Sequence, residues 1–153
     1  MSPPRLLITG SRSWTDRGRL HHELDRAAIH LGFLKVVDLS TAGGHVTRQL
    51  LIPEMRLIHG DAEGADRLAD TWATLYRPHV VVERYPYPSL LGRRGGPHRN
   101  TYMVGLGADL CLAFLTPCTQ PTCRRVDDHE SHGTTKCAEL AESFGIETWR
   151  VRR

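Results

Sequence analysis

Short apolar runs that alternate with helical patterns constrain the fold of this chain more than any other feature. Five runs rich in apolar and β-branched residues have the composition of strands, at 5–9, 55–59, 80–82, 109–115 and 147–151. Apolar side chains recur at helical spacing over 20–31, 64–76 and 134–144, and Pro97 is suited to open a further helix. This alternation predicts an α/β fold: a doubly wound, mostly parallel sheet of about five strands with helices on both faces.

Two segments interrupt the alternation. The length of 153 residues fits one domain, so 1–153 is predicted to fold as a single unit. Residues 32–53 contain only a short strand-like pair, Val36–Val37, and a flexible Gly43–Gly44, and they are predicted to form an irregular connection. Residues 116–132 are polar and contain cysteine and histidine, and they are predicted to form an inserted loop.

Composition and charge argue against two classes of protein. The formal charge of +3 and the aromatic content of 7% are low for a protein that binds nucleic acid, so nucleic acid is not the expected partner. The sequence has no apolar run near the roughly 20 residues that cross a bilayer, and its start does not resemble a signal peptide. We therefore expect a cytoplasmic protein without membrane contact, and a homodimer is a reasonable expectation at this size.

Three of the predicted strand-to-helix connections contain glycine together with hydroxyl or charged residues. They are Gly10–Arg12, Gly60–Gly64 and Ser131–Thr135. The carboxyl ends of parallel strands meet at one edge of the sheet, and a following helix offers free N–H groups and a positive dipole there. The three connections together predict a phosphate-binding edge. None of them matches the GxGxxG or Walker A pattern.

The acidic and basic residues near these connections allow two interpretations each. Asp61, Glu63 and Asp66 either accept hydrogen bonds from ribose hydroxyls or stabilise the start of a helix. Arg93, Arg94, His98 and Arg99 lie among glycines, either as a mobile basic loop that closes over phosphates or as a solvated loop.

Cysteine and histidine gather in the inserted loop. Cys118, Cys123, His129 and His132 are the residue types that zinc prefers, although their spacing is not that of a recognised zinc finger. The two interpretations are a structural zinc site that orders the loop and a set of unpaired thiols and solvated histidines. Cys111 has the sequence context of a buried strand residue.

Several of these segments together resemble a known family. Gly10-Ser-Arg12, the run His59-Gly-Asp-Ala-Glu-Gly-Ala-Asp66, Arg99-Asn100 with Met103, and Gly133-Thr134 are similar to the YspA-like branch of the SLOG superfamily. This superfamily groups DNA-processing protein A and the LOG phosphoribohydrolases on a Rossmann-like fold. The resemblance implies a Rossmann-like domain with a pocket for nucleotides or nucleotide-derived ligands. The expected ligand residues are Gly10, Ser11, Arg12, Gly60, Asp61, Glu63, Gly64, Asp66, Arg99, Asn100, Gly133, Thr134 and Thr135.

One position departs from the LOG hydrolases. Their catalytic glutamate falls at Cys137, and Glu139 lies two positions further along, on another side of the helix. The first expectation is therefore a module that binds or senses a nucleotide-derived ligand. The alternatives are a LOG-like hydrolase of the N-glycosidic bond of a nucleoside monophosphate, with Asp61, Glu63 or Asp66 as acid or base, and a single-stranded nucleic-acid-binding module. The sequence does not decide whether the protein is an enzyme.

Overall fold

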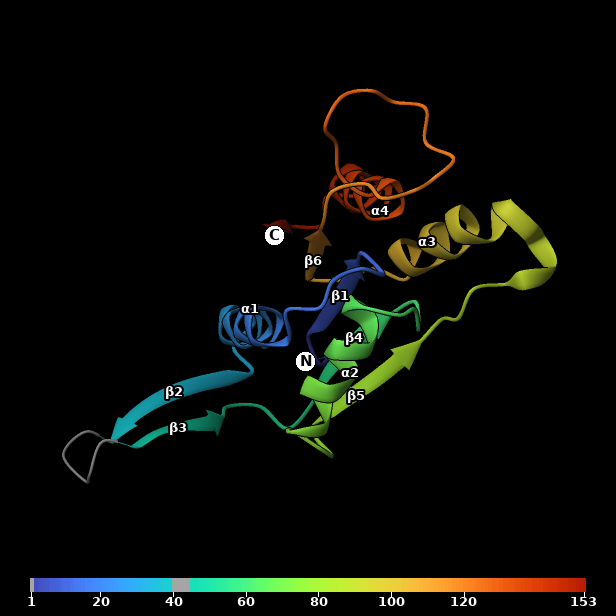
Figure 1. Ribbon diagram of the computed structural model, residues 1–153. Helices are drawn as coiled ribbons and strands as arrows, with labels where there is room; N and C mark the ends of the chain where they lie inside the picture. Colours follow the sequence, from blue (N-terminus) through green and yellow to red (C-terminus); the bar gives the residue numbers. More distant parts are fainter. Residues whose placement is uncertain (1, 40–44) are drawn as a thin grey trace.

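The computed structural model describes residues 2–39 and 45–153 and is built around a parallel sheet (Figure 1). Its strands are β1 (Arg5–Gly10), β4 (Met55–His59), β5 (Val80–Arg84), β6 (Leu110–Leu115) and β7 (Thr148–Arg152). They lie in the order β5-β4-β1-β6-β7, and each neighbouring pair is parallel. The structure therefore confirms the predicted α/β class and the five-stranded sheet, with each predicted strand in place to within two residues at either end.

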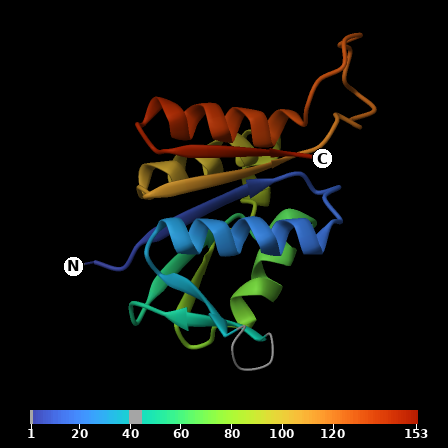
Figure 2. The same ribbon diagram turned by 90° about the vertical axis from the view of Figure 1, so that its left-hand side faces the viewer.

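Helices cover both faces of the sheet (Figure 2). On one face lie α1 (Arg17–His30) and α2 (Ala65–Thr74), and on the other lie α3 (Gly95–Gly105) and α4 (His132–Ser143). Side chains alternate along β1, so that Leu6 and Ile8 pack under α1 and α2 while Leu7 packs under α3 and α4. Within the described ranges, none of the helices is long and apolar enough to span a membrane.

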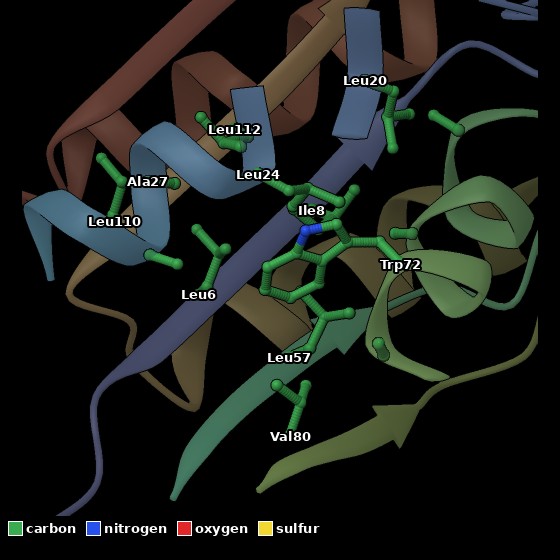
Figure 3. Close-up of a cluster of buried hydrophobic side chains, with 14 of the residues drawn as sticks. Leu6, Ile8, Leu20, Leu24, Ala27, Leu57, Trp72, Val80, Leu110 and Leu112 are labelled. Atoms are coloured by element: carbon green, nitrogen blue, oxygen red, sulfur yellow. The ribbon is translucent and has the colours of Figure 1, made fainter. Parts of the chain in front are cut away.

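The larger of the two cores lies under α1 and α2 (Figure 3). Leu20 and Leu24 of α1 and Trp72 of α2 meet the strand side chains there, and all three are at most 1% exposed. Each such side chain contributes about 1.5–3 kcal/mol of burial free energy. The periodic stripe seen in the sequence of both helices is thus the contact surface with the sheet.

The segment 32–53 forms more structure than the sequence predicts. An antiparallel hairpin of β2 (Leu34–Leu39) and β3 (His45–Leu50) replaces the expected irregular connection, so that expectation was wrong; Gly43–Gly44 lie outside the described residues. Along β3, Val46, Thr47, Arg48 and Gln49 are all exposed, so both faces of this strand meet solvent. A strand that faces solvent on both sides lacks the alternation of buried and polar residues by which strands are recognised.

The segment before α3 is also more regular than expected. A 3₁₀ turn over Ser89–Arg94 runs directly into α3, so Arg93 and Arg94 lie in this turn and not in a loop, whereas His98 and Arg99 lie in the helix expected to open at Pro97. The expectation of a basic loop was wrong because glycine at 92, 95 and 96 was taken as a sign of irregular chain. Tyr87 packs against Gly95 and donates a hydrogen bond to the Gly92 carbonyl, which supports the turn.

The connectivity reverses beside β1. The chain passes from β1 to β4 and β5 on one side, then returns to β6 and β7 on the other. In open α/β sheets such a reversal leaves a crevice at the carboxyl ends of the two strands that flank it, here β1 and β6. Figure 2 shows that the loop from Thr116 to Ser131 projects from this same edge.

We predict that Gly10→Ala destabilises the protein, because the end of β1 packs directly on α2. A Cβ at Gly10 would lie 2.3 Å from the Ala65 Cβ and 3.1 Å from the Phe114 Cβ. Overpacking of this kind costs about 1–3 kcal/mol. Urea unfolding measures the loss, and Gly105→Ala is the matched control because nothing lies within 4 Å of its added Cβ. Equal stability of the two variants would contradict this account of the packing.

Candidate functional site at the carboxyl edge of the sheet

Three hydroxyl groups meet between the ends of β1 and β6. The Thr116 hydroxyl donates to the Ser11 Oγ at 2.6 Å, and the Ser13 Oγ lies 2.8 Å from Ser11 and 3.0 Å from Thr116. Ser11 and Thr116 are buried, whereas Ser13 is exposed. Of the three, the sequence pointed only to Ser11. The hydroxyl cluster depends on a contact between residues more than 100 positions apart, which no local pattern records.

The first two glycine connections touch each other. The Ser11 carbonyl accepts from the amides of Trp14 at 3.2 Å and Ala65 at 3.3 Å. A Cβ at Gly64, which has φ of +78°, would lie 2.4 Å from the Ser11 carbonyl oxygen. Glycine at 64 therefore permits both the positive φ and the close approach. Trp14 is 2% exposed and packs on Phe114, so it belongs to the core and offers no surface for stacking a base.

The amides of the Gly60 connection are bonded to side chains of the same segment. The Asp66 Oδ2 accepts from the amides of Gly60 and Ala62, both at 3.1 Å. The Asp61 amide, at a residue with φ of +53°, donates to the His59 Nδ1 at 3.0 Å. A carboxylate thus already occupies the position that an external anion would take in such a ring of amides.

His59 is held in one tautomer by its two contacts. Its Nδ1 accepts the Asp61 amide, so the proton is on Nε2, which donates to the Asp70 carboxylate at 2.9 Å. The ring is fully buried, and Asp70 also pairs with Arg84. The two contacts of the His59 ring therefore hold the backbone of the Gly60 connection in place.

Within the described part of the chain, two buried polar atoms near Gly60 have neither a hydrogen-bond partner nor an ion-pair partner. They are the Asp66 Oδ1 and the Arg99 Nε. Arg99 donates through Nη1 to the Gly60 carbonyl at 3.0 Å and through Nη2 to Asn100 at 3.4 Å. Burial raises the pKa of the Asp66 carboxyl, while the His59 ring, the two amides and Arg99 act in the opposite direction. This corner of the edge therefore holds a buried acceptor and a buried donor that have no partner among the described residues.

The third predicted connection is the start of a helix without a side-chain cap. Ser131 is the N-cap of α4, its side chain does not bond the helix, and within the described residues its buried Oγ has no partner. The first intrahelical bond runs from the Thr135 amide to the Ser131 carbonyl at 3.1 Å, so the amides of His132, Gly133 and Thr134 precede it. The Thr135 hydroxyl bonds the same carbonyl at 3.0 Å, so its role is structural.

Other predicted site residues are not brought together. Arg12 and Glu63 are exposed, and Asp61 forms an ion pair with Arg67 at 3.1 Å. Cys137, at the position of the LOG glutamate, is fully buried, and burial raises the pKa of its thiol. Glu139 is exposed, as the helical spacing predicted.

The cysteines and histidines of the inserted loop converge. Ligand atoms of Cys118, Cys123, His129 and His132 all lie within 4.8 Å of one another. The Cys123 Sγ is 3.2 Å from the His129 Nε2 and 3.3 Å from the His132 Nε2, and the two nitrogens are 3.2 Å apart. Ligands at tetrahedral zinc lie about 3.4 Å apart for two nitrogens and about 3.6 Å apart for sulfur and nitrogen. The three closest ligand atoms therefore need only a small expansion to hold a metal ion, and Cys118 completes a set whose atoms all lie within 4.8 Å.

The orientation of His129 also suits a metal. Its Nδ1–H donates to the Asp127 carbonyl at 2.7 Å, which leaves the Nε2 lone pair directed at the other ligands. Metal-binding histidines usually have such a second contact, which fixes the tautomer. The sequence identified all four residues, but only the fold shows that they meet.

The two chain segments that enter and leave the loop are joined to each other. We call this element the clasp: the Cys118 amide donates to the His129 carbonyl at 2.8 Å, the Ser131 amide donates to the Thr116 carbonyl at 3.0 Å, and Pro117 pairs with Glu130. An open groove of about 670 Å³ runs beside the loop toward the end of β7. Thr116 of the hydroxyl cluster lines it, together with three of the four Cys/His residues of the loop, Cys118, Cys123 and His129.

The fold and this edge define a Rossmann-like α/β protein with an inserted Cys/His loop. No protein-family model matches the chain. It is similar to the Gene 61 protein of Mycobacterium phage D29, with 33% identity over 150 residues that cover 93% of this chain and 91% of the phage protein. The chain therefore belongs to the family of this phage protein.

We predict that Asp66→Ala destabilises the fold more than Asp66→Asn. Alanine leaves the buried amides of Gly60 and Ala62 without an acceptor, at a cost of about 2–5 kcal/mol for the pair. Asparagine keeps a side-chain oxygen at the same place. Chemical denaturation of the three proteins measures the difference, and equal losses in both variants would show that the Oδ2 contacts do not hold the connection.

Proposed function

We propose that the protein binds a phosphate-bearing, nucleotide-derived ligand at the carboxyl edge between β1 and β6. The observation that carries this proposal is the N-terminus of α4, which no side chain caps. The buried Ser131 Oγ lies at the same N-terminus and has no hydrogen-bond partner among the described residues. Three amides without an intrahelical acceptor and the positive end of the dipole of this twelve-residue helix lie at this N-terminus. A phosphate group supplies the acceptors that such an end lacks.

The surroundings of α4 extend the same site. The hydroxyl cluster of Ser11, Ser13 and Thr116 is joined to Ser131 through the bond between the Ser131 amide and the Thr116 carbonyl. Hydroxyls donate to phosphate oxygens, and the exposed Arg12 adds a charged donor from the same connection. The adjoining groove has room for a nucleoside, since it is of the size that small ligands occupy.

The free atoms of Asp66 and Arg99 support a sugar at the other end of the edge. A hydroxyl group donates one hydrogen bond and accepts another, which matches a free carboxylate oxygen and a free Nε–H. This role fits the resemblance to the YspA-like branch of the SLOG superfamily, which was drawn in part from Asp66 and Arg99.

Binding is favoured over hydrolysis by the state of the candidate acids and bases. Cys137 is buried with a raised thiol pKa, and Glu139 points to solvent. Asp61 is paired with Arg67, Glu63 is exposed, and one oxygen of Asp66 is bonded to two amides. A nucleic-acid platform is disfavoured by the burial of Trp14.

We predict that Ser131→Asp abolishes this binding without loss of stability. A carboxylate at the N-cap bonds the free amides of α4 itself and so competes with an external anion. Binding of a panel of nucleoside mono- and diphosphates is measured by native mass spectrometry and calorimetry. We expect at least about a tenfold loss of affinity for AMP, or for the tightest nucleotide of the panel, equivalent to about 1.4 kcal/mol.

The matched control for this experiment is Ser131→Ala, which removes the hydroxyl but leaves the amides free. Its affinity is expected to lie between those of the wild type and Ser131→Asp. No binding to the wild type at millimolar concentration would refute the proposal. Undiminished binding to Ser131→Asp would place the ligand elsewhere.

We further propose that the four Cys/His side chains of the inserted loop bind a zinc ion that has a structural role. Two thiolates and two imidazoles form a common zinc set, and four protein ligands leave no open position for substrate. The preset tautomer of His129 favours the same assignment. Zinc supplies a tetrahedral cross-link here, and the chain's own residues position the loop around it.

Native mass spectrometry and elemental analysis test the metal directly. We expect one zinc per chain, stoichiometric loss of zinc in Cys123→Ser, and full retention in Gln120→Ala, a non-ligand change in the same loop. Cobalt substitution gives the absorption bands of a tetrahedral thiolate site if the geometry is right. A chain that stays metal-free when refolded with excess zinc would rule out the assignment.

A further inference from the structure

We propose that the metal centre orders the anion site, so that metal and anionic ligand bind cooperatively. The cooperativity with the ligand rests on the proposed function, whereas the ordering of the site by the metal does not. The connection runs through the clasp and then through the hydroxyl of Thr116. Metal binding would thus order the carboxyl edge of the sheet as well as the inserted loop.

Both ends of the metal loop lead directly into the anion site. The first ligand, Cys118, lies two residues after Thr116, whose hydroxyl bonds both Ser11 and Ser13. The last ligand, His132, is the first residue of α4 and follows Ser131. A metal that fixes Cys118 and His132 therefore fixes the hydroxyl cluster and the helix start at the same time.

Burial of apolar side chains does not hold the loop in place. Every residue from 117 to 131 is exposed or only partly buried, and Val126 is fully exposed. The ligand side chains are the part of the loop that converges, at 3.2–3.3 Å for the closest three. Without a metal these contacts are weak hydrogen bonds of a thiol and two imidazoles, so the clasp is expected to open.

Opening of the clasp would affect the connection that follows β1 through the side chain of Thr116. The Ser13 amide donates to the Ser11 Oγ, and that same oxygen accepts from Thr116. When Thr116 moves, Ser11 and Ser13 lose their third partner, and the free amides of α4 lose their fixed direction. Linkage then requires that a ligand bound at the edge strengthens metal binding by the same factor, typically about 5- to 150-fold.

Hydrogen exchange of the full chain tests the ordering without any ligand. Metal-loaded protein is compared with protein stripped by a chelator and with Cys123→Ser. We expect faster exchange in residues 11–14 and 132–135 in both metal-free forms, by at least about tenfold, and no change in β4, residues 55–59. Unchanged exchange at 11–14 would overturn the coupling. Faster exchange at 55–59 as well would also overturn it, because the effect would then be general unfolding.

The variant Thr116→Val separates the link from the metal site. Valine keeps the shape but removes the hydroxyl, so residues 11–14 are expected to exchange fast with and without metal. The loop 118–132 should still respond to metal as in the wild type. A metal response at 11–14 that persists in Thr116→Val would show that the coupling does not pass through this hydroxyl, contrary to the proposal.

The last measurement compares AMP affinity in the metal-loaded and metal-free wild type. Tighter binding to the loaded form by at least about fivefold is expected, and equal affinities would overturn cooperativity. If AMP and inorganic phosphate bind to neither form, the proposed function fails at this site. The exchange experiment then still decides whether metal orders the edge.

Discussion

The contact between the end of β1 and the start of α2 determines the geometry of the whole carboxyl edge. One carbonyl, that of Ser11, accepts from both Trp14 and Ala65. The approach is possible because positions 10 and 64 carry no Cβ, since either Cβ would lie within 2.4 Å of the opposing segment. The two glycines are thus required by packing, before any ligand is considered, and they place the β1 and β4 connections side by side.

The same contact shows why a glycine-rich connection need not be an anion site. In the β1 connection the amides of Ser13 and Trp14 are bonded to Ser11, and in the Gly60 connection the Asp66 carboxylate takes the amides. The chain satisfies its own donors wherever a side chain or carbonyl is within reach. Among the three connections of the described chain, the one before α4 combines an N-terminus without a side-chain cap with a buried hydroxyl, the Ser131 Oγ, that has no partner. The proposed anion binding therefore depends chiefly on the last of the three connections.

The sequence predicted the elements that bury one face and missed those that do not. The five strands and three of the helices follow from apolar runs or periodic apolar residues that lie in a core, and α3 follows from Pro97 near its start. The hairpin at 34–50 was missed because both faces of β3 meet solvent. Ser13 and Thr116 were missed because their contact is purely tertiary. For Asp66 the sequence found the residue, and the structure shows a contact with the chain's own amides. The superfamily, the nucleotide and the homodimer stay predictions.

The inserted loop illustrates how a segment without a core acquires a fixed shape. Ordering a residue costs about 1–2 kcal/mol of backbone entropy, whereas structural zinc binds with about 10–16 kcal/mol in small peptides. One zinc ion bound by the cluster would therefore offset the ordering of roughly ten residues, which is close to the number of residues from Cys118 to His129. Thr116 and Ser131 flank that stretch and bond each other, so the proposed coupling would extend this ordering to the hydroxyl cluster. Buried apolar side chains in a larger loop would hold its shape at all times. A loop held by a metal would be ordered only while the ion is bound.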